Sequence, residues 1–133
     1  MDREHSSMGV REIPRSEWQE FLAGFGSRHR AWLTTVASGE PLHVDVAERP
    51  LQSVTAIVEG NRVVSIDIRF HDAPGAPELL RVRDPAAVRV DEVRPGTARG
   101  LEIVDEAGVS TRLRFRAVQP PEMLDGLAPG ELP

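Results

Sequence analysis

The sequence predicts a mostly β protein of the α+β class, in which an N-terminal helix precedes an antiparallel meander of about six to eight short strands. Two observations carry this prediction. Apolar residues recur at helical spacing up to residue 25 and then alternate with polar residues, and turn-forming residues separate the alternating segments. We expect a small barrel or a curved sheet, with the helix covering an open edge or mouth.

The chain of 133 residues is short enough to form one domain. Residues 1–11 are polar and aperiodic, which predicts a disordered leader, and residues 119–133 are rich in Pro and Gly, which predicts a flexible tail. The folded helix-plus-sheet domain is therefore expected to span residues 12–118.

The helix has recognisable start and stop signals. Ser16 is the expected N-cap and Gln19 follows three residues later, as in a capping box. Gly26 is placed to end the helix in a left-handed conformation. One face of the predicted helix is apolar and consists of Trp18, Phe21, Leu22 and Phe25.

The strands are predicted from alternation and from turn residues. Gly60-Asn61 is a strong two-residue turn signal, and Asp84-Pro85 interrupts the pattern between two short strands. The expected strands before the last hairpin are 31–36, 42–47, 54–58, 62–70, 79–83 and 87–90.

The last hairpin can be registered from the sequence. A three-residue loop, Glu106-Ala107-Gly108, brings Leu101 opposite Leu113 and keeps the apolar residues of both strands on one face. A loop of this length needs a left-handed residue at its third position, and Gly108 occupies that position.

Composition excludes several chemistries. Cys, Lys and Tyr do not occur, which excludes disulfides, thiolate sites, Schiff-base chemistry and the lysine of a phosphate-binding P-loop. The net charge of −5 makes a nucleic-acid partner unlikely. No apolar run approaches the ~20 residues of a membrane span, and the N-terminus lacks signal-peptide features, so we expect a cytoplasmic protein that needs neither membrane nor cofactor.

The opening of the predicted domain resembles a known family. The pattern I-x-R-x-x-W-x-x-F-L-x-x-F resembles an uncharacterised family of small bacterial proteins with a domain of unknown function, and residues 50–54 and 79–92 are similar as well. The resemblance covers residues 12–118 and implies no activity. Relatives are expected to carry a His-bearing segment where this chain has Leu80-Arg81, so a family site there would be missing. The pattern is formed by Ile13, Arg15, Trp18, Phe21, Leu22 and Phe25.

The aromatic residues allow two interpretations. Exposed rings next to arginines would form a stacking platform for a base or a sugar. Aromatic residues at helical spacing more often belong to the core, and these side chains are interpreted as anchors that hold the helix on the sheet. They are Trp18, Phe21, Phe25 and Trp32.

The histidines suggest a weaker site. His43 and Asp45 share a strand face, and with His29 and Asp67 they would supply a mixed histidine and carboxylate metal site. Two-residue spacing on a strand is common by chance, so a solvated sheet face is the favoured interpretation and no metal is expected. The pair His71-Asp72 resembles an acid–base pair but has no nucleophile beside it.

The arginines are the most distinctive polar feature. Arg112, Arg114 and Arg116 alternate along the last strand and are expected to project from one face as a site for an anion or an acidic partner. The predicted register places Glu102 opposite Arg112 and Gly100 opposite Arg114, so part of this positive charge is expected to be free. Other outward arginines are expected on the preceding strands: Arg81, Arg83 and Arg89.

Three functions are compatible with these features. The favoured hypothesis is a non-enzymatic adaptor module that binds a protein partner or associates with itself, because the sequence contains no catalytic constellation. The first alternative is a small enzyme, or a metal- or small-ligand-binding protein, that uses His43, Asp45 and His71. The second alternative is a single-strand nucleic-acid binder, which the net charge disfavours.

Overall fold

The structure is a computed structural model that describes residues 9–71 and 79–116. The predicted tail, Asp72 and most of the predicted leader lie outside the described residues. Within them the chain forms one 3-10 turn, one α-helix and eight strands. The elements are β1 (Gly9–Glu12), η1 (Arg15–Glu17), α2 (Trp18–Arg28), β2 (Leu33–Ser38), β3 (His43–Glu59), β4 (Arg62–Phe70), β5 (Leu79–Arg83), β6 (Pro85–Arg94), β7 (Thr97–Asp105) and β8 (Ser110–Phe115).

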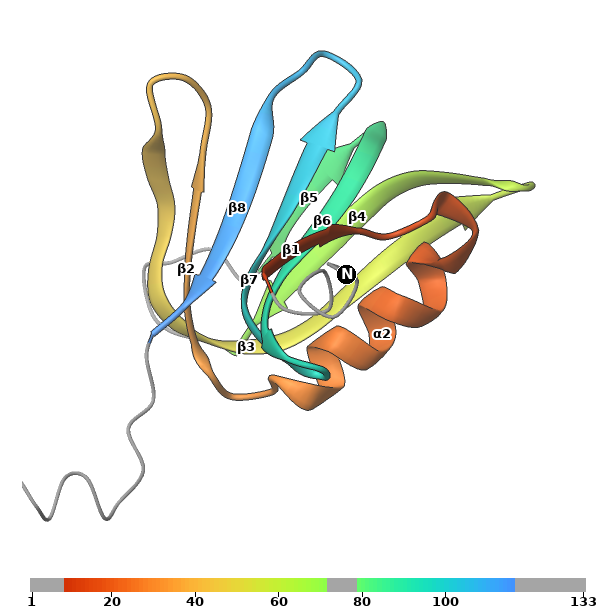
Figure 1. The fold of residues 1–133 in the computed structure, drawn as a ribbon. Coiled ribbons are helices and arrows are strands. Elements are labelled where there is room, and N and C mark those ends of the chain that lie inside the picture. Colours follow the sequence, from red (N-terminus) through yellow and green to blue (C-terminus); the bar gives the residue numbers. More distant parts are fainter. Residues whose placement is uncertain (1–8, 72–78, 117–133) are drawn as a thin grey trace, which may run out of the picture.

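All eight strands belong to one antiparallel sheet, in the order β1-β6-β7-β8-β2-β3-β4-β5 (Figure 1). Consecutive strands form two meanders, β2 to β5 and β6 to β8, which are joined where β8 pairs with β2. Over the described residues the sheet is strongly curved and does not close, because β1 and β5 form its two ends. The prediction of a mostly β fold with a curved sheet is confirmed.

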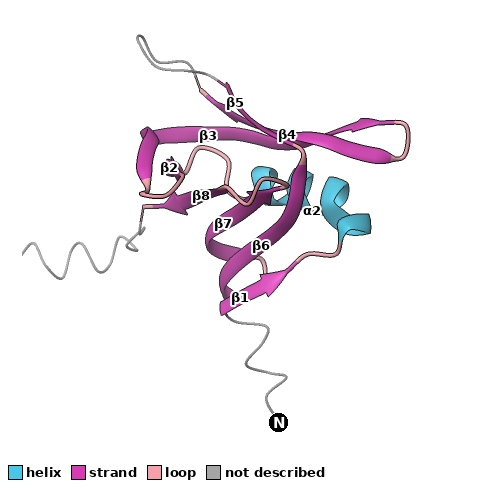
Figure 2. Ribbon diagram, turned by 90° about the horizontal axis from the view of Figure 1, so that it is seen from above, coloured by secondary structure: helices cyan, strands magenta, loops and turns pink. Residues whose placement is uncertain are grey.

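The helix lies within the curve of the sheet (Figure 2). It packs against β3, beside the part of that strand that follows Pro50, where pairing with β2 ends. The helix thus lies on β3, inside the strand order, and the expectation that it covers an open edge or mouth stays a prediction. At the crossing, a Cβ on Gly26 would lie 2.7 Å from the backbone nitrogen of Val54, so only glycine lets the two backbones approach this closely.

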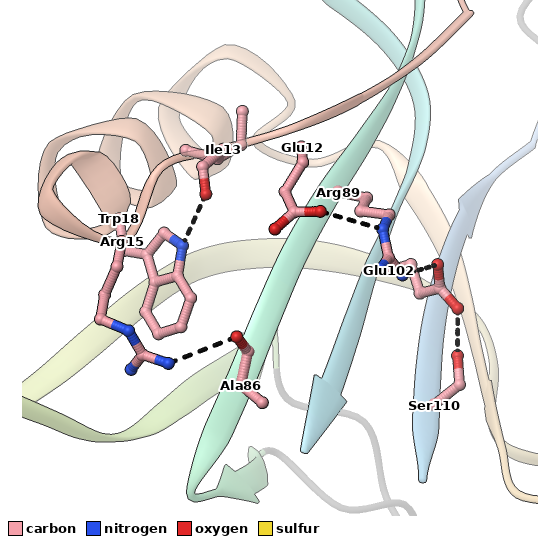
Figure 3. Close-up of polar contacts among 8 residues, drawn as sticks. All are labelled: Glu12, Ile13, Arg15, Trp18, Ala86, Arg89, Glu102 and Ser110. Atoms are coloured by element: carbon pink, nitrogen blue, oxygen red, sulfur yellow. Dashed lines mark hydrogen bonds and ion pairs between the residues drawn. The ribbon is translucent and has the colours of Figure 1, made fainter. Parts of the chain in front are cut away.

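Trp18 anchors the helix, as predicted. Its side chain is 1% exposed, and its Nε1–H donates to the carbonyl of Ile13 at 3.0 Å (Figure 3). The guanidinium of Arg15 covers the ring at 4.4 Å from the ring centroid. The hydrophobic core that surrounds this anchor includes Leu22, Phe25, Val36, Val54, Ile68, Phe70, Ile103 and Leu113.

The predicted ends of the helix were wrong. Ser16 lies in the 3-10 turn and makes no capping bond, because η1 leads the chain into a helix that begins at Trp18. Gly26 stays inside the helix, where the contact with β3 requires it. The left-handed residue comes later, at Ala31, with φ of 73°.

Two strand predictions need correction. Residues 9–11 are not part of a leader, because Gly9–Glu12 form β1 and pair with β6, where Arg11 meets the buried carboxylate of Glu92 at 3.1 Å. The segments 42–47 and 54–58 are parts of one strand, β3, whose register shifts beside Gln52 allow it to bend. Local composition did not reveal these features, since both depend on partners that are distant in the sequence.

The register of the last hairpin is as predicted. Leu101 pairs with Leu113, Glu102 with Arg112 and Gly100 with Arg114. Gly108 has φ of 88°, the left-handed conformation that its loop requires.

Candidate binding surface on the outer face of the sheet

One row of charged residues crosses four neighbouring strands on the outer face of the sheet. The paired positions run from Glu12 on β1 through Arg89 on β6 and Glu102 on β7 to Arg112 on β8. Negative and positive charges therefore alternate across the strands. Figure 3 shows the first three residues of this row side by side.

Glu102 lies at the centre of the row. Its carboxylate accepts a hydrogen bond from Ser110 Oγ at 2.6 Å and forms ion pairs with Arg89 at 3.3 Å and Arg112 at 3.7 Å. The Ser110 hydroxyl, followed by Arg89, holds the pKa of Glu102 below its ordinary value, against the opposite effect of partial burial. Glu102 is therefore ionised at neutral pH and organises the arginines on both sides of it.

A second row of paired positions lies beside the first and consists of Val10, Asp91, Gly100 and Arg114. It contains a hollow of about 150 Å³ at Gly100. Gly100 has no side chain, so Arg114 extends across it from β8 to Asp91 on β6, with 3.3 Å between Nη1 and Oδ2. Arg99 reaches the other oxygen of Asp91 at 3.3 Å. Val10, which is 63% exposed, lies on the rim of the hollow.

Gly100 is also required by the backbone. A Cβ at this position would lie 2.2 Å from the carbonyl oxygen of Leu113, a distance that no side chain tolerates. The close approach of β7 and β8 at this point therefore keeps the hollow open.

The expectation of free charge on the last strand was wrong. Arg112 pairs with Glu102, Arg114 with Asp91, and Arg116 with Glu48 at 3.5 Å. Glu102 is the direct cross-strand partner of Arg112, but Arg114 reaches past Gly100 to Asp91 on the next strand, so a register based on direct partners underestimates the pairing. All three guanidinium groups are nevertheless more than half exposed, so a partner can reach them.

The other predicted arginines lie elsewhere. Arg81 and Arg83 are on β5, at the far end of the sheet from β1, so the five proposed binding residues do not form one site. Arg81 binds Asp67 through two hydrogen bonds of 2.7 and 2.8 Å. Within the described parts of the chain Arg83 has no hydrogen-bond or ion-pair partner.

Asp67 was expected on a solvated face, and this was wrong. Its side chain is only 3% exposed because Arg81 lies across it from the neighbouring strand. The hydrogen bond from Arg81 holds the pKa of Asp67 below its ordinary value, although burial acts in the opposite direction. Asp67 is thus part of a structural ion pair.

His43 and Asp45 are brought together at the start of β3. His43 Nε2 lies 2.9 Å from Asp45 Oδ1, and Ser38 Oγ donates to Asp45 Oδ2 at 2.6 Å. The carboxylate therefore lies between the hydroxyl and the imidazole, whereas a nucleophilic triad needs the imidazole between the other two groups. This geometry does not activate Ser38.

The remaining histidines lie away from this pair. His71 N–H donates to the carbonyl of Pro50, roughly 20 Å along β3 from His43 at the usual rise per residue. Among residues 9–71 and 79–116, no cluster of three or more His, Cys, Asp or Glu residues is arranged to hold a metal ion.

His29 is a structural residue inside the core. Its Nδ1 lies 2.8 Å from the carbonyl of Phe25, and its Nε2 accepts from the backbone N–H of Ala98 at 3.2 Å. Its ring stacks on Phe115 with 4.6 Å between centroids. Burial lowers the pKa of His29, so the imidazole is neutral and joins the end of α2 to β7 and β8.

The residues that shape the hollow were not predicted from the sequence. Val10 falls in the predicted leader, and Gly100 was predicted only as the residue opposite Arg114. The available signal was Gly100 itself, since a glycine inside an alternating strand often marks a close approach of backbones.

Comparisons of the chain with family models, with curated proteins and with solved structures found no match. Membership of the bacterial family that the opening pattern resembles thus stays a prediction. In the described part of the chain, no helix is both long and apolar enough to cross a membrane.

Proposed function

We propose that this protein is a non-enzymatic adaptor module that binds a protein partner or a second copy of itself through the outer face of β1, β6, β7 and β8. The observation that carries the proposal is the hollow above Gly100, which has an apolar rim residue and charges of both signs around it. About 150 Å³ is room for a single side chain, whereas small-molecule pockets usually start near 300 Å³.

The charges around the hollow support recognition of another protein surface. Exposed ion pairs contribute only about 0–1 kcal/mol each to stability, so folding alone does not require such a dense set. Alternating charges select a partner with the complementary pattern and accelerate its association. A second copy of the same face, rotated about a two-fold axis, offers such a pattern because both signs are present.

The alternative functions have less support. The enzyme or metal-protein hypothesis needs His43, Asp45 and His71 in one place, and the fold separates His71 from the other two. The nucleic-acid hypothesis needs exposed rings, and Trp18, Phe25 and Phe70 are buried. A cytoplasmic location remains a prediction from the sequence.

Substitution of Arg114 by Glu tests the proposal. The new carboxylate faces Asp91 across the hollow, so association should weaken strongly, while an exposed strand position keeps the fold intact. We expect wild-type self-association, measured by sedimentation velocity, to fade as salt rises from about 50 to 500 mM. If the wild type is monomeric, capture of partners by the immobilised protein is compared between wild type and variant.

Arg83→Glu is the matched control, because Arg83 is an exposed strand arginine at the other end of the sheet. It should associate like the wild type. Equal association of all three proteins would exclude this face as the contact surface. A melting temperature far below wild type for Arg114→Glu, with unchanged association, would show that the ion pairs serve the fold.

A further inference from the structure

A second, larger hollow lies between α2 and β3, away from the charged outer face. Its volume is about 320 Å³, at the lower end of the range for small-molecule sites. The residues around it come from one side of the helix and from four consecutive positions of the strand. They are Ala23, Ser27, Arg30, Gln52, Ser53, Val54 and Thr55.

The fold builds this hollow from three features. Ala23 and Ser27 are four residues apart and share one side of α2, and Arg30 follows just after the helix ends. The register shift of β3 beside Gln52 turns that side chain out of the regular alternation. Gly26 holds the helix close to the strand, so the small side chains beside it leave space.

The polar groups around the hollow are all capable of donating hydrogen bonds. The hydroxyls of Ser27, Ser53 and Thr55, the amide of Gln52 and the guanidinium of Arg30 have no side-chain partner among residues 9–71 and 79–116. None of the described residues that line the space carries a carboxylate.

Among the described residues, few acidic groups lie near the hollow. Asp67, the cross-strand neighbour of Thr55, is already bound by Arg81, and Arg69 lies opposite Ser53. The nearest acid along the helix is Glu20, about one turn before Ala23 and far from Arg30. Arg30 is the one charged residue among the described residues that line the hollow, and it offsets the negative end of the α2 dipole beside it.

A hollow of similar size on β4 and β5 provides the contrast. It measures about 330 Å³ and is lined by Ser65 and by two arginines, Arg81 and Arg83. Arg81 is already bound to Asp67, and Arg83 has no partner among the described residues. Two carboxylates, Glu59 and Asp84, line it as well, and an anion placed there would meet their repulsion. The two hollows are therefore similar in size, and each has one arginine without a partner among the described residues. Among those residues, only the hollow on β4 and β5 is lined by carboxylates.

We propose that the hollow between α2 and β3 binds a phosphate group, either as free phosphate or as part of a small phosphorylated metabolite. The guanidinium of Arg30 supplies the charge-assisted hydrogen bonds that phosphate oxygens prefer. The hydroxyls and the amide supply neutral donors for the remaining oxygens. The space beyond one phosphate group accommodates a small organic group.

Titration of the full-length protein with inorganic phosphate, glucose 6-phosphate and glucose at constant ionic strength tests this site. Two-dimensional NMR of the backbone amides reports both affinity and position. We expect shifts at residues 27–30 and 52–55 with both phosphates and none with glucose. Arg30→Gln should weaken phosphate binding about tenfold or more, since a hydrogen bond to a charged group is lost.

Arg83→Gln is the matched control and should bind phosphate like the wild type. Tighter binding of glucose 6-phosphate identifies a phosphorylated metabolite as the ligand, and equal binding identifies free phosphate. Absence of shifts at residues 27–30 and 52–55, or equal weakening by both substitutions, would overturn the proposal.

Discussion

The two faces of β6, β7 and β8 differ completely although they are formed by alternate residues of the same strands. The inner face is aliphatic and buried, and consists of Val88, Val90, Leu101, Ile103 and Leu113. The outer face is charged and consists largely of Arg89, Asp91, Glu102, Arg112 and Arg114. A step of one residue along a strand therefore separates the core from the proposed contact surface.

The two faces also differ in what they contribute to stability. A fully buried aliphatic side chain stabilises the fold by about 1.5–3 kcal/mol, whereas an exposed ion pair contributes about 0–1 kcal/mol. Substitution on the inner face should therefore change folding, and substitution on the outer face should mainly change recognition. The following predictions test this division, from the largest effect to the smallest.

Trp18→Ala should produce the largest effect. Trp18 is fully buried and holds the carbonyl of Ile13, so its removal leaves a cavity and should reduce the free energy of unfolding by about 3–5 kcal/mol. Urea denaturation monitored by circular dichroism measures this change. Trp32→Ala is the matched control, because Trp32 is only partly buried and should cost less. Equal losses for the two variants would contradict the role of Trp18 as the anchor.

Acid should destabilise the folded protein by protonating His29, which lies in the core and bonds to Ala98 on β7. Burial holds the pKa of His29 below the ordinary value of about 6.5, so below about pH 6.5 the unfolded chain binds a proton that the folded chain does not. Stability should therefore be fully present above this pH and decline as pH falls toward the pKa of the folded state. Melting temperatures from about pH 7.5 to 5 measure this dependence.

His29→Gln removes the titrating group and serves as the comparison for the acid effect. The variant should be less stable than the wild type at neutral pH, but its stability should decline less as pH falls. Parallel declines in the two proteins would show that another group is responsible.

Arg112→Gln should have the smallest effect, below about 1 kcal/mol, because Arg112 is exposed and its contact with Glu102 is long. Arg81→Gln is the informative comparison, since it leaves the buried carboxylate of Asp67 without its two hydrogen bonds. Its cost in urea denaturation should be clearly larger. If Arg112→Gln costs as much as Arg81→Gln, the outer face contributes to folding more than its exposure indicates.

Features that depend on neighbouring residues were predictable from the sequence. The Leu101–Leu113 register, the left-handed Gly108 and the break at Asp84-Pro85 all follow from turn chemistry and alternation within a few residues. The core position of Trp18 follows from helical spacing.

Most of the site depended on contacts between distant segments. Asp91 and Arg114 are separated by 23 residues, and their contact requires both the β6–β7–β8 order and the missing side chain of Gly100. The hollow beside Arg30 requires the helix to meet β3 at Gly26, which local signals had placed at the end of the helix.

By itself, the sequence determined the class of fold, the register of the last hairpin and the apolar and polar sides of its two strands, because alternation and turn preferences act over a few residues. Only the tertiary structure decided that Gly9–Glu12 joins the sheet as β1, that Asp67 is buried and that every arginine of β8 finds a carboxylate. The physical reason is that burial and ion pairing depend on which segments the folded chain brings together. Those segments lie far apart in the sequence, beyond the reach of any local pattern.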